Sequence, residues 1–373
     1  LDDTFWSLLS RYRVFVIFDE IHHCAGDQLE NANAWGQKII QKIQGQAAYT
    51  LALTGTPWRS DKIPIALASY CRDGNVACDY TYGLDDAIAD GVCRVPQITA
   101  IDNENIAVKT GLVEERFSSF SEVLGKSKCT YQHIIDNTVL VSYLLKVTAK
   151  KLSQVRRQHD NAGVLVVAAS VEHALKIADI LFKETGESAR IATYMHDDAQ
   201  ETIANFRDSR EKWIISVGMI SEGTDIPRLR VCCHLTRVKT ELYFRQVLGR
   251  ILRSNGQPND VGYLFMPAEP NLVEFAQRVN EDIPRCSAIS IETMGASTIM
   301  ELQPVKPTEI ADNEELETNG EIPIFLNIAD MPSTCSDSGD PLSTLSDAYD
   351  ATLGLFGKFR ERIIRLQMAS GLS

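Results

Sequence analysis

Two neighbouring carboxylates, Asp19 and Glu20, are the residues whose types and position most directly suggest chemistry. They follow residues 14–18, an apolar run of β-branched and aromatic residues that predicts a central parallel strand buried on both faces. Open α/β sheets bind ligands at the carboxyl ends of such strands. We therefore expect both carboxylates at the metal of a nucleotide site, Asp19 holding Mg²⁺ and Glu20 deprotonating the water that attacks a γ-phosphate. Because strand ends often expose acidic residues, an ordinary surface turn is the alternative.

Composition sets the class of protein in which such a site would act. The 373 residues, 44% of them hydrophobic, are enough for two domains with real cores. No apolar run approaches the ~18 residues of a membrane span, which predicts a soluble, cytoplasmic protein. The nine cysteines include no CxxC pair, and the adjacent Cys232 and Cys233 are interpreted as reduced core thiols.

The net charge of −13 is concentrated in one segment. Residues 301–350 carry twelve acidic residues and one base, Lys306, which is −11, so the rest of the chain carries only −2. A nearly neutral body can still line a groove with lysine and arginine and bind a phosphate backbone. The acidic segment itself, rich in Ser, Thr and Pro, is predicted to be a linker.

The two carboxylates belong to the first of four patterns that appear in a fixed order along the chain. They are DEIH at residues 19–22, TGTP at 54–57, GMISEGTDIPRLR at 218–230, and YFRQVLGRILR at 243–253. These resemble motifs II, III, V and VI of the superfamily 2 DExH-box helicases and translocases, especially the XPB-like and type I restriction-subunit motor domains. Residues 164–170 would be motif IV.

This resemblance implies two RecA-like domains that bind ATP and Mg²⁺ in the cleft between them and move nucleic acid, DNA more than RNA. It assigns a coupling role to His22, Thr54 and Thr56, and an arginine-finger role to Arg250 and Arg253. The resemblance also implies that four residues bind the nucleotide: Asp19, Gly223, Asp225 and Gln246. It implies that three residues contact the phosphates of the bound strand: Ser170, Ser221 and Thr224. On one helix, Gln246, Arg250 and Arg253 would share a face; a solvated basic face is the alternative.

The predicted fold class is α/β, with two RecA-like parallel-sheet domains, the first incomplete, and a C-terminal helical and acidic extension. Residues 1–100 form the rear part of the first domain, 101–160 a linker and connecting helix, 161–270 the second domain, and 271–373 the extension. Helices are expected at 34–44, 131–159, 171–184, 199–207 and 271–280, and strands at 163–170, 190–194 and 213–217. Residues 353–368 are predicted to form a final amphipathic helix.

The phosphate-cradling pattern GxxxxGK[ST] does not occur in this sequence. The only Gly-Lys-Ser is at residues 125–127, and Phe120 stands where the first glycine should be. We expect a chain that begins in mid-domain and hydrolyses ATP poorly by itself, although its parent would be an ATPase. Two rival hypotheses remain: an RNA helicase, and a regulatory or scaffold protein that keeps the fold and binds a protein partner through its C-terminal extension.

Overall fold

The computed structural model describes residues 3–28, 31–59, 61, 63–72, 74–195, 198–219, 224–254, 260–279 and 351–365. Its N-terminal part, residues 3–76, contains α1 (Asp3–Arg11), β1 (Phe15–Phe18), the 3₁₀ turn η1 (Ile21–His23), α2 (Ala34–Lys42) and β2 (Tyr49–Ala52). The helices that follow are α3 (Leu84–Ala89), α4 (Phe120–Lys126), α5 (Tyr131–Ile135), α6 (Thr138–Val155), α7 (Val171–Thr185), α8 (Ala199–Asp208), α9 (Glu241–Leu252) and α10 (Pro270–Gln277). The strands are β3 (Val95–Thr110), β4 (Val113–Phe117), β5 (Gly163–Ala168), β6 (Ala189–Thr193), β7 (Trp213–Val217), β8 (Leu229–Leu235), β9 (Val261–Pro267) and β10 (Ala351–Arg365).

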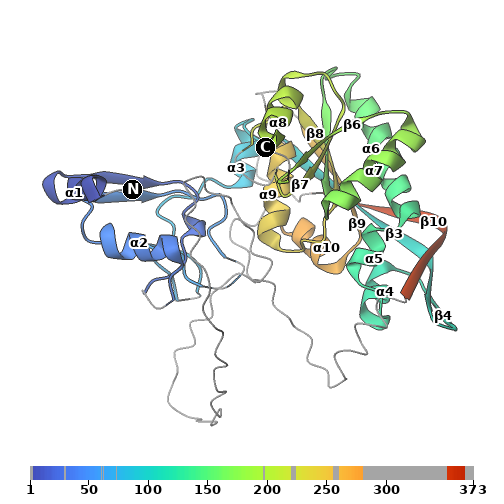
Figure 1. Cartoon of the computed structure of the whole chain (residues 1–373), viewed down its shortest axis with the longest axis horizontal. Coiled ribbons are helices and arrows are strands. Elements are labelled where there is room, and N and C mark those ends of the chain that lie inside the picture. The colour runs from blue at the N-terminus through green and yellow to red at the C-terminus, as the bar shows by residue number, and fades with distance from the viewer. Residues whose placement is uncertain are drawn as a thin grey trace, which may run out of the picture.

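The larger body of the molecule is built on one eight-stranded sheet, here called the main sheet. Its order is β10-β3-β9-β8-β5-β7-β6, with β4 also paired to β3. The pairs from β3 to β6 are parallel, whereas β10 and β4 run antiparallel to β3. Helices α6 and α7 lie on one side of the strands and α8 and α9 on the other (Figure 1). This layering is the doubly wound arrangement that alternating strands and helices produce.

Burial explains why the central strands read as continuous apolar runs. Every residue of β5 and β7 is buried, and Trp213 at the start of β7 is fully enclosed. The flanking helices begin at polar caps: Asn137, Ser170 and Thr240 accept hydrogen bonds from the first turns of α6, α7 and α9. The predicted strands and helices between residues 163 and 217 are confirmed within one or two residues at each end.

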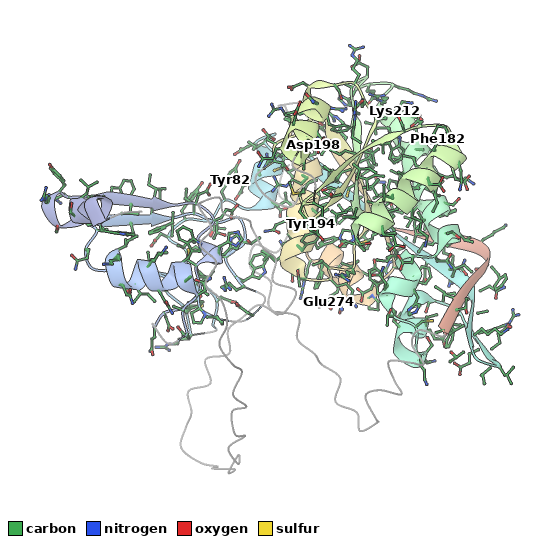
Figure 2. The ribbon with its side chains drawn as sticks, viewed as in Figure 1. Tyr82, Phe182, Tyr194, Asp198, Lys212 and Glu274 are labelled. Atoms are coloured by element: carbon green, nitrogen blue, oxygen red, sulfur yellow. The ribbon has the colours of Figure 1, made fainter. Side chains whose placement is uncertain are left out.

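The N-terminal part holds a separate, smaller apolar cluster. Ile21, Ile39, Ile43 and Ile65 form it beneath the two-stranded parallel pair β1-β2. The chain leaves this cluster at about residue 76 and enters the main apolar cluster with Leu84 of α3. Tyr82 lies where the chain passes between them, and its hydroxyl donates to Asp90 at 2.8 Å (Figure 2).

The prediction that β1 is a central strand buried on both faces is wrong for the described residues. Phe15 and Ile17 are 55% and 58% exposed, and β1 pairs with β2 alone among the described strands. The apolar run is therefore half covered: Val16 and Phe18 pack on the small cluster, whereas Phe15 and Ile17 on the opposite face are exposed.

Two further predictions fail at the edge of the main sheet. Residues 101–160, expected as a linker and connecting helix, contain most of β3 and all of β4, and Asn103 in β3 is fully buried. Residues 353–368, expected as an amphipathic helix, form β10 as far as Arg365; the final eight residues lie outside the described part. Gly357, with φ of 70°, marks a bulge in β10 that suits a strand rather than a helix interior.

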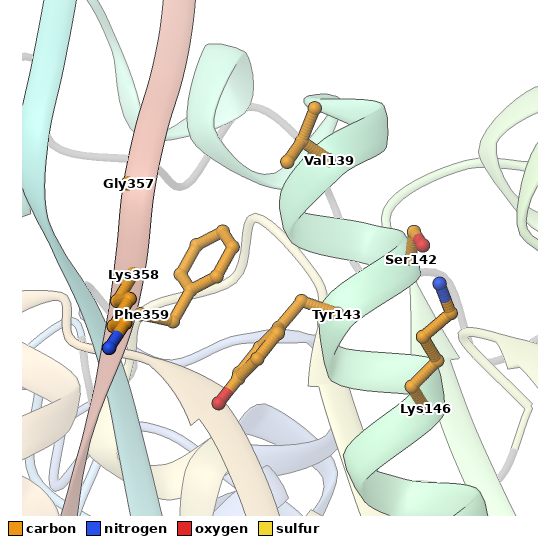
Figure 3. A pocket seen from close by; sticks show the side chains of 7 residues that line it. All are labelled: Val139, Ser142, Tyr143, Lys146, Gly357, Lys358 and Phe359. Carbon is orange, nitrogen blue, oxygen red and sulfur yellow. The ribbon is translucent and has the colours of Figure 1, made fainter.

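Side chains from α6 hold β10 in place. The rings of Tyr143 and Phe359 stack with centroids 4.3 Å apart, and the Tyr143 hydroxyl donates to Glu361 at 2.7 Å. Burial, together with Glu361, raises the pKa of Tyr143 to about 12. A groove of about 480 Å³ lies between α6 and β10, and both rings are among the side chains that line it (Figure 3). Contacts between residues 216 and 218 positions apart in the sequence therefore hold β10 at the edge of the sheet.

Other predictions agree with the structure or fall outside it. The helices expected at residues 34–44 and 271–280 are confirmed as α2 and α10, and Cys232 and Cys233 are buried free thiols. The helix expected at 131–159 is divided into α5 and α6 by the turn at Asp136 and Asn137. The acidic segment 301–350 lies outside the described residues.

Candidate active site

The two carboxylates stand on a tight turn that begins where β1 ends. Glu20 caps η1 with φ of 52° and ψ of 47°, a left-handed backbone that non-glycine residues rarely adopt. Its backbone N–H donates to Asp19 Oδ1 at 3.0 Å, and both residues are exposed. Such strain is found at functional sites, where surrounding contacts hold it in place.

His22 links this turn to the TGTP loop that follows β2. Its Nδ1 lies 3.3 Å from Glu20 Oε2, 2.8 Å from Thr54 Oγ1 and 3.3 Å from Thr56 Oγ1. Thr54 Oγ1 also accepts from the Thr56 backbone N–H at 3.0 Å. His22 is only 2% exposed, so the network is sheltered from water on the histidine side. The structure thus brings together Glu20, His22, Thr54 and Thr56, which the sequence placed in two separate motifs.

The arginine helix α9 faces the segment that follows β7. Arg250 Nη1 donates to the Thr224 carbonyl at 2.7 Å, and Arg253 Nη1 pairs with Asp225 Oδ1 at 2.6 Å. Gln246 lies one turn earlier on the same helix and is partly exposed. The arginines of the YFRQVLGRILR segment therefore contact the GMISEGTDIPRLR segment, Arg250 at a backbone carbonyl and Arg253 at the carboxylate of Asp225.

Arg253 stands at the C-terminal end of α9, as its capping residue, and not inside the helix. Helix α9 ends at Leu252, and Arg253 is extended, with ψ of 116°. The cause is a short antiparallel pairing with the chain that leads into β3: Cys93 bridges Arg253, Arg94 N–H donates to the Leu252 carbonyl at 2.6 Å, and Ser254 N–H donates to the Val92 carbonyl at 3.0 Å.

Arg94 anchors this pairing from inside the protein. It is 1% exposed, and its Nε donates to Asp260 Oδ2 at 2.7 Å. Its remaining donors reach the carbonyls of Leu229, Ile251 and Pro227 at 2.8 to 3.0 Å. Burial lowers the pKa of Arg94; burial also opposes ionisation of Asp260, but Arg94 and Arg230 outweigh it, so the pKa of Asp260 is lowered.

Two of the residues predicted to contact nucleic acid, Ser170 and Thr224, lie in the described part of the chain. Ser170 follows β5, and its Oγ accepts from the His173 N–H at 3.1 Å as the cap of α7, which leaves its own hydroxyl proton to donate. Thr224 Oγ1 is buried with no hydrogen-bond partner among the described residues. Ser221 and Gly223 lie outside the described part of the chain.

Sequence reasoning missed three residues that support this site. Arg59 donates from Nη1 to the His22 carbonyl at 2.5 Å and pairs with Asp61, so it braces the histidine. Arg94 and Asp260 were missed because their partners are 133 to 166 residues away. For Arg59 a signal existed, because a cation directly after the TGTPW segment is placed to reach the neighbouring loop.

The described residues define what the site can hold. They contain no group of three or more His, Cys, Asp or Glu side chains arranged for a metal ion. Mg²⁺ in nucleotide sites needs only one or two carboxylates together with phosphates and water, and Asp19 and Glu20 are of that type. Over the same part of the chain, no helix has both the length and the apolar character required to cross a bilayer.

Comparisons with known proteins place the arginine helix in a family. Residues 145–255 match the helicase conserved C-terminal domain. An uncharacterized protein of Mycobacterium leprae, ML1624, is 31% identical over 274 residues, 72% of this chain and 45% of that protein. The Bacillus subtilis protein named "Putative ATP-dependent helicase YeeB" is 23% identical over 337 residues, 85% of this chain and 49% of that protein.

Among solved structures, the "ATP-dependent Type ISP restriction-modification enzyme LlaBIII bound to DNA" aligns with a TM-score of 0.42 and 15% identity, over 74% of this chain and 20% of that one. This chain spans about half the length of the two curated relatives. The matched range runs from within α6 to just after α9, so it includes β5 to β8 and Arg250 and Arg253. The chain therefore contains a helicase C-terminal domain, and the arginine helix is part of it.

Proposed function

We propose that this chain carries motor elements of an ATP-dependent helicase or translocase of the superfamily 2 DExH type, acting on DNA. ATP and Mg²⁺ would bind between two RecA-like domains, of which the main sheet forms the second. The observation that carries the proposal is the network from Glu20 through His22 to Thr54 and Thr56. It joins the residue that would activate water to a hydroxyl-bearing loop, and a plain surface turn has no need of it.

The chemistry follows from the charges of this network. The Glu20 carboxylate would accept a proton from the attacking water, and Asp19 would hold Mg²⁺ beside it. His22 Nδ1 has three oxygens within 3.3 Å, so its hydrogen bonds can change with the charge on Glu20. A change at Glu20 would thereby reach Thr54 and Thr56, which is the coupling role proposed for these residues.

Arg250 and Arg253 would supply positive charge to the γ-phosphate from the second domain. Here they bind Thr224 and Asp225, so a nucleotide would have to compete with a carbonyl and an exposed carboxylate. The Arg253–Asp225 pair has side-chain exposures of 43% and 61%, and exposed pairs of this kind contribute little free energy. Breaking the Arg253–Asp225 ion pair so that Arg253 can reach a phosphate therefore costs little free energy.

The residues fit Mg²⁺-ATP in part. Carboxylates and arginines are present, but no GxxxxGK[ST] loop occurs in the 373 residues to grip the β- and γ-phosphates. We propose that the chain by itself hydrolyses ATP poorly, and that the whole protein is the active ATPase. Turnover by the 373-residue chain at a rate typical of helicases would contradict this part of the proposal.

DNA binding by the 373-residue chain gives a direct test. We expect duplex DNA labelled with fluorescein to bind with an affinity that falls as salt rises, because phosphate contacts release counterions. Unlabelled duplex DNA should compete better than duplex RNA of the same sequence. Stronger competition by RNA would favour the RNA-helicase reading, and no binding of either at low salt would favour a scaffold protein.

A further inference from the structure

Trp58 is buried in an unusual place. It directly follows the TGTP loop and is 6% exposed, yet it belongs to neither apolar cluster formed by the described residues. Its backbone N–H donates to the Thr56 carbonyl at 2.8 Å, which fixes the backbone of Trp58 to the loop that binds His22. A large ring that is buried outside an apolar core requires another kind of cover.

Arg245, on helix α9 of the larger body, supplies part of that cover. Its guanidinium carbon lies 5.3 Å from the centroid of the Trp58 ring, within the range of a cation–π contact. Arg245 is on α9, next to Gln246 and five residues before Arg250. This contact therefore joins the TGTP loop of the N-terminal part to the arginine helix of the helicase domain.

The guanidinium is held firmly in its plane. Nε and Nη2 donate to Glu241 Oε1 at 3.0 and 2.9 Å, Nη1 donates to the Val279 carbonyl at 2.8 Å, and Nη2 donates to the Arg278 carbonyl at 2.9 Å. Arg278 in turn donates to Glu241 Oε2 at 2.7 Å. A cation fixed in this way transmits displacement, because it cannot swing aside as an exposed arginine does.

We infer that Trp58 and Arg245 form a positioning contact through which movement of the TGTP loop shifts α9, and with it Arg250. This inference rests on the proposed function for its purpose, since it gives the network of Glu20, His22 and Thr54 a mechanical route to the arginines. The route is short: Thr56 is two residues from Trp58, and Arg245 is on the helix that carries Arg250. Neither residue touches the reacting atoms in this account.

The chain offers a matched control for this contact. Lys38 lies 5.3 Å from the centroid of Trp35, the same distance as in the Trp58–Arg245 contact. That pair lies within α2, three residues apart, and Trp35 is 49% exposed. Loss of the Trp35 ring should therefore affect only α2, whereas loss of the Trp58 ring should also lower the stability of α9.

The experiment measures amide hydrogen exchange in α9 of the 373-residue chain, without nucleotide. We expect Trp58→Leu to speed exchange in residues 241–250 by about tenfold, a loss of roughly one desolvated cation–π contact. Trp58→Phe, which keeps a π face, should restore most of the protection, and Trp35→Leu should leave α9 unchanged. Equal protection in Trp58→Leu and the unchanged chain would overturn the inference, as would a Phe variant that behaves like the Leu variant.

A second measurement guards against a variant that merely unfolds. With 5-fluorotryptophan in the protein, the ¹⁹F resonance that is absent from Trp58→Phe belongs to Trp58. Arg245→Gln should shift this resonance and leave that of Trp213, in the core of the main sheet, in place; no shift would overturn the inference. Because neither measurement uses ATP or DNA, failure of the contact is distinguishable from failure of the proposed function, which DNA binding and ATP hydrolysis report.

Discussion

Replacing Arg94 by methionine tests how the chain between the two apolar clusters is fixed to the helicase domain. Methionine keeps much of the length of the side chain but removes every donor. The change leaves Asp260, whose side chain is 5% exposed, with Arg230 as its nearest remaining cation, and it takes a donor from three carbonyls. Because Arg94 is itself buried, water cannot easily replace the lost hydrogen bonds.

The expected loss of stability can be estimated from this geometry. Removing one partner of a buried ion pair costs about 3–5 kcal/mol, because the remaining charge stays buried and poorly compensated. Arg230 still neutralises Asp260 in part, which favours the lower half of that range. The orphaned carbonyls add about 1 kcal/mol each where water does not enter. With three such carbonyls, we therefore expect Arg94→Met to lower the free energy of unfolding by about 6 kcal/mol.

Urea unfolding followed by far-ultraviolet circular dichroism measures this loss at pH 7. Arg116→Met is the control, because Arg116 pairs with Glu114 on the surface at 66% exposure and should cost less than about 0.5 kcal/mol. The pKa of Asp260 is lowered, so its contribution is present above its unfolded pKa of about 3.9 and is lost only as pH falls through the lower folded value. The difference should thus be equal at pH 7 and pH 5. A loss below about 1 kcal/mol would show that Arg94 does not fix the chain to the helicase domain.

Three further predictions concern single residues. His234 is fully buried, and burial lowers its pKa to about 4; stability should therefore be complete above pH 6.5 and fall by up to about 3 kcal/mol on acidification to pH 4, a decline that urea titrations of His234→Phe should not show. Glu20 has a left-handed backbone, so Glu20→Gly should be about 1 kcal/mol more stable than Glu20→Ala, and equal melting temperatures would contradict the assigned conformation. Ser170 caps α7, so Ser170→Ala should cost about 1 kcal/mol in thermal unfolding, with Ser170→Asp close to the unchanged chain.

The sequence predicted the helicase domain well because its signals are local. Strands β5 and β7 are continuous apolar runs, α7 and α8 show helical spacing between them, and α9 shows it further along the chain. Such periodicity depends only on neighbours in the chain and on burial of one face or two. The order of the acidic, threonine and arginine motifs likewise indicated the candidate site residues. The roles of these residues stay predictions.

The failures arose where distant parts of the chain decide the structure. Residues 351–365 have apolar residues that suit a helix, but pairing with β3, about 250 residues earlier, makes them a strand. The burial of Asn103 and the ending of α9 at Leu252 also depend on partners remote in sequence. Trp58 was visible in the sequence, yet nothing local indicates that Arg245 would meet it.

The most direct test of the central claim is ATP hydrolysis by the full-length product of the gene that encodes this chain, with and without duplex DNA. We expect turnover that DNA stimulates and that Glu20→Gln abolishes, because the amide cannot accept the proton of the attacking water. Arg250→Ala should lower the rate by a factor of about 10³ or more, as expected for an arginine finger. Turnover that survives Glu20→Gln, or no turnover with any nucleic acid, would contradict the account.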